Sequence, residues 1–318
     1  MFEKIIKPYK GLSQEVWILA LTTLINRAGA MVVPFLALYL TNYLEFTMEQ
    51  VGWIMSCYGF GSLAGTFIGG KLADRLGYHL TMYVSLLGAG LVFLALQCLS
   101  DYYHICIGIF ILSLIADMFR PAMWVALDSY SRAENRTRSV TLIRLAINLG
   151  FSMGPAVGGL IITWWTYKGI FIVDGITCLT AGLIIAFYLS QKTEPQAKKE
   201  TIESPKKSPY KDRHFLIFWV ALFLIGFTFM QYFSTMPLYY SEFVILSEDR
   251  IGLLLASNGL LIVLLEMPLV NAFEKIKLNH LKIVIAGTIL LLLSFLILNL
   301  APWVGLAIVG IVLMTFGE

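Results

Sequence analysis

The feature that most constrains this chain is a series of apolar runs, each about 20 residues long, that follow one another with short polar gaps. Hydrophobic residues make up 58% of the 318 residues and charged residues only 14%, whereas soluble domains carry about a quarter charged residues. A bilayer core about 30 Å thick is crossed by a helix of roughly 20 apolar residues. Because backbone polar groups cannot be left unsatisfied in lipid, the chain is predicted to be an all-α integral membrane protein.

Hydropathy predicts about ten membrane-spanning helices. The predicted spans are Val16 to Leu40, Val51 to Gly70, Leu80 to Leu99, Tyr103 to Leu127, Val140 to Trp164, Ile170 to Ser190, Phe215 to Tyr240, Ile251 to Phe273, Leu281 to Leu300 and Trp303 to Gly317. The connections between them are short, with one exception, so consecutive helices are expected to run antiparallel.

The exception is the segment 191–213, which is rich in Lys, Pro, Ser and Glu. It contains too few apolar residues to bury a core, so we interpret it as a flexible polar linker. The linker divides the chain into an N-terminal half of six spans, residues 1–190, and a C-terminal part of four spans, residues 214–318.

The basic residues lie almost entirely on one side of the predicted spans. Alternate connections carry 18 of the 23 Lys and Arg residues, and the opposite connections carry only Lys168 and Arg250. Cytoplasmic loops retain positive charge, so the N-terminus and the linker are predicted to be cytoplasmic. We expect a multi-pass protein of the plasma (inner) membrane that acts as a monomer. The net charge of +3 gives no support for a nucleic-acid partner.

The two parts of the chain resemble each other at an offset of 200 residues. Gly52 aligns with Gly252 and Gly59 with Gly259, and the acidic-basic pair at 74–75 aligns with a second one at 274–275. Two parallel halves of six helices each are the simplest construction. Since only four spans follow the linker, we expect that the chain lacks two C-terminal helices; the alternative is a genuine ten-helix protein.

The loop between the second and third spans carries a recognisable pattern: Gly70, Asp74, Arg75 and Gly77 in the order G-x3-D-R-x-G. This resembles the signature of the same loop in the major facilitator superfamily (MFS), except that Tyr78 and His79 replace the usual basic pair. The glycines would permit close packing and a tight turn, and the charged pair would form contacts that change between conformations.

The fifth span contains closely spaced small residues: Gly150, Gly154, Pro155, Gly158 and Gly159. Small residues at these spacings clear one helix face for close approach, and a proline bends a helix. The pattern resembles the fifth-span motif of many MFS antiporters. Two interpretations stay open, a packing seam without functional meaning and a mark of antiport.

Ionisable residues inside predicted spans are costly and usually face a cavity or a partner, and three places in the sequence stand out. Arg27 lies in the first span, Asp117 and Arg120 lie three residues apart in the fourth, and Glu266 lies in the eighth. Each is a candidate proton or substrate group, and each has a structural alternative. For Arg27 the alternative is a pair with a carboxylate on a neighbouring helix, and for Asp117 and Arg120 it is a static pair with each other. For Glu266 it is a neutral carboxyl that is hydrogen-bonded.

In the MFS the first, fourth, seventh and tenth spans line a central cavity. That resemblance makes Arg27, Asp117 and Arg120 cavity groups, together with Gln231, Tyr232 and Tyr239 of the seventh span. It implies a secondary transporter that binds a small-molecule substrate and protons and works by alternating access between two halves. The branch that the sequence resembles is bacterial drug or metabolite efflux, that is, proton-coupled antiport.

Two other functions stay open. One is proton-coupled uptake by a symporter, and the other is a receptor or assembly protein that keeps the fold without transport. No nucleotide-binding loop, HExxH pair or nucleophile elbow is present, so neither an enzyme nor a cofactor is predicted. The four cysteines lie in apolar stretches without metal-ligand spacing, and no metal site is predicted.

Overall fold

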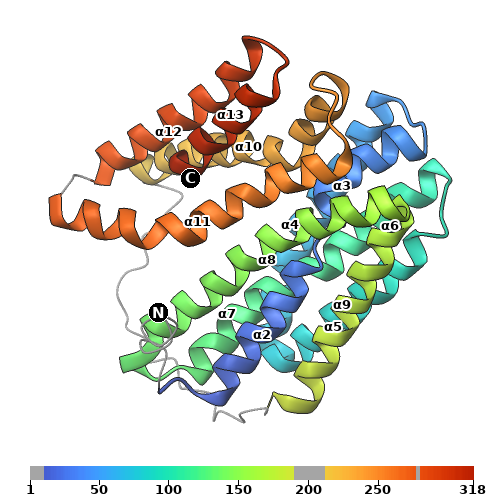
Figure 1. Ribbon diagram of the computed structural model, residues 1–318. Coiled ribbons are helices and arrows are strands. Elements are labelled where there is room, and N and C mark those ends of the chain that lie inside the picture. The colour runs from blue at the N-terminus through green and yellow to red at the C-terminus, as the bar shows by residue number, and fades with distance from the viewer. Residues whose placement is uncertain (1–10, 190–211, 277–279) are drawn as a thin grey trace.

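The computed structural model describes residues 11–189, 212–276 and 280–318, and every regular element in these ranges is helical. The predicted linker lies almost wholly outside the described residues. Figure 1 shows two helix bundles, one made of α2 to α9 and the other of α10 to α13. The helices are α2 (Gln14–Ala28), α3 (Val32–Leu38), α4 (Met48–Leu76), α5 (Tyr78–Leu96), α6 (Tyr102–Asp117), α7 (Phe119–Tyr130), α8 (Arg136–Trp164), α9 (Tyr167–Tyr188), α10 (Arg213–Glu242), α11 (Glu248–Ile276), α12 (His280–Leu296) and α13 (Val304–Gly317), with short π or 3-10 helices at Tyr39–Tyr43, Ala133–Asn135 and Ile297–Asn299.

The predicted all-α membrane fold is confirmed by the lengths and apolarity of these helices. Among the described residues, 8 helical segments are long and apolar enough to cross a bilayer: Gln14–Tyr43, Met48–Leu76, Tyr78–Leu96, Tyr102–Tyr130, Arg136–Trp164, Tyr167–Tyr188, Arg213–Glu242 and Leu281–Asn299. The α13 helix is a shorter apolar helix, and α11 is 29 residues long, which is enough to span at about 1.5 Å per residue. Together these segments coincide with the predicted spans.

The outer surface of the first bundle is apolar, as a lipid-facing surface must be. On α4 the side chains of Phe60, Leu63 and Phe67 are 67%, 71% and 64% exposed. They lie three to four residues apart and so share one helix face. The opposite face of α4 carries small residues that pack against α6 and α7. The exposed face of α4 is therefore apolar, unlike that of a soluble amphipathic helix.

The first span is not one continuous helix, contrary to the prediction. It is interrupted at residues 29–31, between α2 and α3, and we call these residues the first-span break. Pro34 accounts for the position, because a proline ring clashes with the carbonyl of the residue four positions earlier, here Ala30, and has no N–H to donate. The break lies two residues after Arg27.

The fourth span is also interrupted, at Met118, where α6 ends and α7 begins. The same argument applies, since Pro121 lies four residues after Asp117 and cannot bond its carbonyl. Pro155 and Pro237 lie inside the continuous helices α8 and α10. The two interrupted spans are thus the first and the fourth, and each break lies beside a charged residue.

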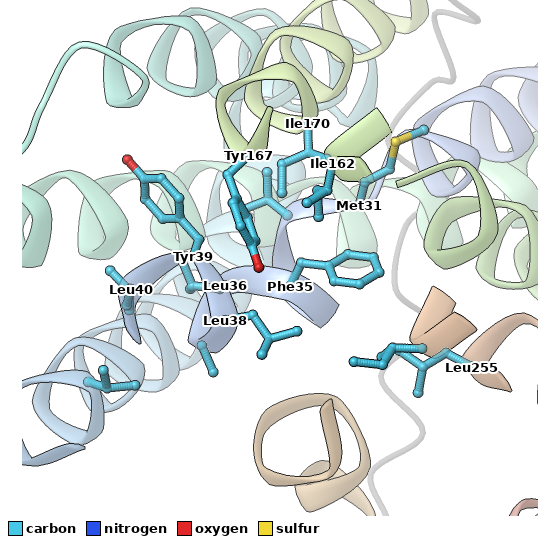
Figure 2. Packing of buried hydrophobic residues seen from close by; sticks show 14 of the residues in the cluster. Met31, Phe35, Leu36, Leu38, Tyr39, Leu40, Ile162, Tyr167, Ile170 and Leu255 are labelled. Atoms are coloured by element: carbon cyan, nitrogen blue, oxygen red, sulfur yellow. The ribbon is translucent and has the colours of Figure 1, made fainter. Parts of the chain in front are cut away.

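A buried apolar cluster holds α3 between the two bundles. Phe35 of α3 and Tyr39 of the following π-helix pack with Tyr167 and Ile170 of α9, and Leu255 of α11 belongs to the same cluster (Figure 2). The rings of Tyr39 and Phe171 meet edge to face with centroids 4.9 Å apart, a favourable aromatic geometry. This packing fixes the part of the first span that follows the break.

Candidate functional site

Arg27 lies at the last turn of α2, immediately before the first-span break. Its guanidinium carbon lies 5.3 Å from the centre of the Phe151 ring of α8, within the range of a cation–π interaction. Its Nε atom is buried and has no hydrogen-bond partner among the described residues. An arginine with an unsatisfied donor inside a membrane protein is costly, so its position calls for a functional explanation.

The groups that interact electrostatically with the Arg27 guanidinium include Asp117, Arg120 and Tyr58. Asp117 and Tyr58 are half-buried and Arg120 is exposed. The structure therefore brings the charged candidates of the first and fourth spans together. We call Arg27, Tyr58, Asp117 and Arg120 the charged cluster.

The static pair of Asp117 with Arg120, one of the two alternatives that the sequence left open, is not found. Within the described part of the chain, no ion pair of 4.0 Å or less joins Asp117 to either arginine of the charged cluster. The two residues lie on either side of the turn at Met118, where α6 ends and α7 begins. Tyr58 was missed by the sequence reasoning, since a tyrosine in the second span gives no signal without knowledge of which helices meet.

The small residues of α8 lie on two faces of that helix. A Cβ atom added to Gly150 would overlap Arg27, one added to Gly154 would lie 3.2 Å from the Ala30 carbonyl oxygen, and one added to Gly158 would lie 3.0 Å from Met31 Cβ. These three positions are four residues apart and form a single stripe. The stripe allows α8 to approach the first-span break closely, as expected for small residues between membrane helices.

The second face of α8 packs against α11 of the other bundle. Gly159 lies against the backbone of Glu248, and the Ser152 hydroxyl donates a 2.9 Å hydrogen bond to the Ala256 carbonyl. The Tyr167 hydroxyl of α9 donates a 2.7 Å hydrogen bond to Glu248 Oε1. We call the end of the first bundle where α2 begins the predicted cytoplasmic face and the opposite end the predicted outer face. These contacts lie in the half of α8 nearer the predicted outer face, and Figure 1 shows α8 and α11 diverging toward the other end.

The fold, the small-residue stripe and the charged cluster agree with a comparison with known families. The family model described as Major Facilitator Superfamily matches residues 17–318. The chain belongs to the major facilitator superfamily.

Individual MFS proteins are similar to this chain over most of its length. It is 24% identical over 326 residues to YqjV, an uncharacterized MFS-type transporter of Bacillus subtilis (strain 168), which covers 98% of this chain and 77% of that protein. It is 23% identical over 330 residues to a Na(+), Li(+), K(+)/H(+) antiporter of Planococcus maritimus, covering 92% of this chain and 76% of the relative. The crystal structure of the peptide transporter POT in complex with sulfate has the same fold, with a TM-score of 0.79 at 16% identity over 98% of this chain and 80% of that one.

The MFS loop signature forms the turn between α4 and α5. Gly77 has a φ of +90°, in the left-handed region that favours glycine, so the predicted tight turn is present. Gly70 has no atom within 4 Å of an added Cβ, and the prediction that it allows close packing is wrong. The close contact is made by Gly69, against Met118. Asp74 and Arg75 are exposed at the end of α4.

The candidates of the seventh MFS span are already engaged with other groups or lie apart from the charged cluster. Tyr239 donates a 2.7 Å hydrogen bond to the Leu298 carbonyl, and Gln231 accepts one from Thr235. Tyr232 is 2% exposed, and its hydroxyl has no hydrogen-bond partner among the described residues. The link between α10 and the charged cluster is apolar, since Phe233 packs at 6.3 Å on the Phe151 ring.

Glu266 lies in α11, but its side chain is outside the part of the chain that the structure describes. Its role as a proton site in this MFS protein stays a prediction.

Proposed function

We propose that this MFS protein is a secondary active transporter that exports a small organic solute in exchange for protons, working by alternating access. The observation that carries the proposal is the charged cluster. Arg27, whose buried Nε has no hydrogen-bond partner among the described residues, interacts electrostatically with Asp117 and Arg120 near the places where the first and fourth spans are interrupted. Interrupted helices at the centre of a transporter characteristically surround the substrate or ion.

Asp117 is the group that we assign to proton coupling in this cluster. When it is ionised, one carboxylate offsets two guanidinium groups, and when it is protonated the cluster gains a full positive charge. A half-buried carboxyl near two arginines changes the affinity of the site for a charged solute when it takes up a proton. Glu266 is the second candidate carboxyl and acts from the other half.

The contacts between α8 and α11 support an exchange between two states. They close the predicted outer half of the interface, whereas α8 and α11 diverge toward the predicted cytoplasmic face (Figure 1). We assign this arrangement to the state that receives a solute from the cytoplasm. The small residues of α8 contact both the first-span break and α11, so a movement of one bundle against the other is transmitted to Arg27.

The charge of the cluster supports a solute with an anionic or strongly accepting group. Two arginines and one aspartate leave a net positive charge in the N-terminal half of the site, which disfavours a bare cation. The relative from Planococcus maritimus is described as an antiporter of Na(+), Li(+) and K(+) for H(+). A monovalent cation is therefore the second candidate substrate, and it would need additional carboxylates such as Glu266.

The proposal includes a topology and a division of the chain. We place the N-terminus and the linker 191–213 in the cytoplasm, with one half at residues 1–190 and the other beginning at residue 214. Proton-coupled uptake and a non-transporting receptor are the rival functions on the same fold.

Flux measurements in inverted membrane vesicles test the proposal. A proton gradient is generated, and a pH-sensitive dye reports its partial collapse when a solute is added from a panel of NaCl, KCl, ethidium and carboxyfluorescein. We expect collapse with an organic solute, and a loss of about tenfold or more in Arg27→Gln, because a lost ionic hydrogen bond costs roughly 1.5–3 kcal/mol. If only NaCl or KCl collapsed the proton gradient, the substrate would be a monovalent cation and not an organic solute. The absence of any solute-dependent proton movement would refute transport by proton exchange.

A further inference from the structure

Asp174 is a fully buried carboxylate that takes no part in the charged cluster. It lies in α9 and is 1% exposed. Its Oδ1 accepts a 3.0 Å hydrogen bond from the Met31 N–H, and its Oδ2 accepts bonds of 3.1 Å from Met31 and 2.9 Å from Val32. Two backbone N–H groups are therefore bonded to α9, that of Met31 at the end of the first-span break and that of Val32 at the start of α3. The Met31 N–H also bonds the Gly29 carbonyl at 2.8 Å, whereas Asp174 is the acceptor found for the Val32 N–H.

These bonds supply acceptors for backbone N–H groups that the first-span break leaves without intrahelical partners. Interrupting a helix leaves backbone N–H groups at the start of the next helix without intrahelical acceptors. No water is available in the hydrocarbon core to satisfy them, so the protein must supply an acceptor. A carboxylate is the strongest acceptor among the side chains and also suits the positive end of α3.

The same face of α9 contacts the residues just before and within the break. A side chain at Gly29 would overlap Thr177, and Asn26 Nδ2 lies 3.5 Å from Cys178 Sγ. Asp174, Thr177 and Cys178 are spaced i, i+3 and i+4, so they share one face of the helix. That face follows the chain from residue 26 to residue 32, with Arg27 in between.

On this geometry we propose that Asp174 is a positioning residue of the transport site. It holds the first-span break in place and thereby determines where the Arg27 guanidinium lies relative to Asp117 and Arg120. The inference rests on the proposed function, which makes Arg27 a substrate or coupling group.

Asp174 acts through the backbone, because its carboxylate oxygens accept hydrogen bonds from the N–H groups of Met31 and Val32. On the side of α8, Gly150 and Gly154 contact residues 27–30. The segment that carries Arg27 is thus held between α8, by close packing, and α9, by hydrogen bonds.

Hydrogen–deuterium exchange of the intact protein tests whether Asp174 holds the first-span break in place. Asp174→Asn removes the charge and places an N–H₂ group against backbone donors. We expect the Val32 amide to exchange about tenfold faster or more, because hydrogen bonds to charged groups are worth roughly a factor of ten or above, and the Met31 amide to change less, since it keeps its bond to the Gly29 carbonyl. The control is Thr180→Val, an exposed position on the same helix, which should leave exchange at the break unchanged. Unchanged exchange in Asp174→Asn would overturn the proposal.

A double-substitution cycle separates positioning from a general structural role. If Asp174 acts through Arg27, then Asp174→Asn should lower the flux at least several-fold in the wild type and less than about twofold in an Arg27→Lys background. An equal loss in both backgrounds would show that Asp174 only stabilises the fold. No flux in the wild type would refute the proposed function and the positioning role with it.

If Asp174→Asn does not fold, Asp174→Glu provides a second test of the proposal. It keeps the carboxylate and should retain slow exchange at Met31 and Val32 and measurable flux. Fast exchange with normal flux in this variant would also overturn the proposal, because the position of the break would then be irrelevant to transport.

Discussion

The Tyr167 hydroxyl donates a 2.7 Å hydrogen bond to Glu248 Oε1 and so joins the two helix bundles at the predicted outer face. The Tyr167 side chain belongs to the buried cluster that also contains Phe35, Tyr39 and Leu255. A polar bond placed beside an apolar cluster fixes the register between α9 and α11, whereas apolar packing alone is not directional.

Removing this bond should favour opening at the predicted outer face. Tyr167→Phe keeps the ring and loses one hydrogen bond to a carboxylate, about 1.5–3 kcal/mol, so the open state should gain about tenfold in population. The measurement is the alkylation rate of a cysteine introduced at Ile251, which is 0% exposed, with the native cysteines changed to serine. Tyr103→Phe, at a position 73% exposed, is the matched control. Equal alkylation rates in the two variants would contradict the proposal that the Tyr167–Glu248 hydrogen bond holds the predicted outer face closed.

Alanine at two glycines should have opposite effects. A Cβ at Gly150 would overlap Arg27, whereas one at Gly70 meets no atom within 4 Å. Overpacking costs about 1–3 kcal/mol, and the higher helix propensity of alanine gains at most about 1 kcal/mol. Gly150→Ala should therefore lower the thermal unfolding temperature and the flux, and Gly70→Ala should leave both unchanged or slightly raised. A destabilised Gly70→Ala would contradict the open space beside Gly70 in α4.

Asp117→Asn should remove most of the pH dependence of flux. The amide is nearly the same size as the carboxyl but cannot take up a proton, so the charge of the cluster becomes independent of pH. Initial rates measured over a series of pH values provide the measurement. Glu49→Gln, on the exposed first turn of α4, is the control. A pH profile unchanged in Asp117→Asn would assign proton coupling to another group.

Acid should loosen the start of α6 through Asp101, which lies outside the spans. The hydrogen bond from the His104 side chain, with those from the backbone N–H groups of Tyr103 and His104, lowers the pKa of Asp101 below its ordinary value of 3.8. A carboxyl with a lowered folded-state pKa stabilises the fold above its unfolded-state pKa, and this contribution is lost as the pH falls through the folded-state value. Between about pH 5 and 3, the unfolding temperature of Asp101→Asn should fall less than that of the wild type. Parallel curves would contradict the assignment.

Much of the fold follows from patterns that act locally along the chain. Apolar runs of helical length predict the spans, and the glycine spacing in α8 predicts a close-packed face. The sequence also predicts Arg27, Asp117 and Arg120 as candidates, because any charge inside an apolar run is conspicuous. What it does not predict is that Asp117 and Arg120 fail to pair, since that depends on an interruption that Pro121 causes in a span of otherwise uniform apolarity.

The role of Asp174 could not be predicted from the sequence either. As a single aspartate in the sixth span it was visible in the sequence, yet its partners are the backbone N–H groups of residues 31 and 32, more than 140 positions away. Backbone groups are identical in every residue, so no sequence pattern marks which of them lack an acceptor. Tyr58 was missed for a related reason, because its meaning depends on facing Arg27 across helices.

The sequence by itself determined that this chain crosses a membrane as helices, because hydration of apolar side chains and the helical period act on neighbouring residues, and its motifs placed it by resemblance among major facilitator proteins. Only the tertiary structure decided which charges meet, where two spans break, and which carboxylate satisfies the exposed backbone. Those are contacts between distant segments, and their energies exist only once the helices are packed.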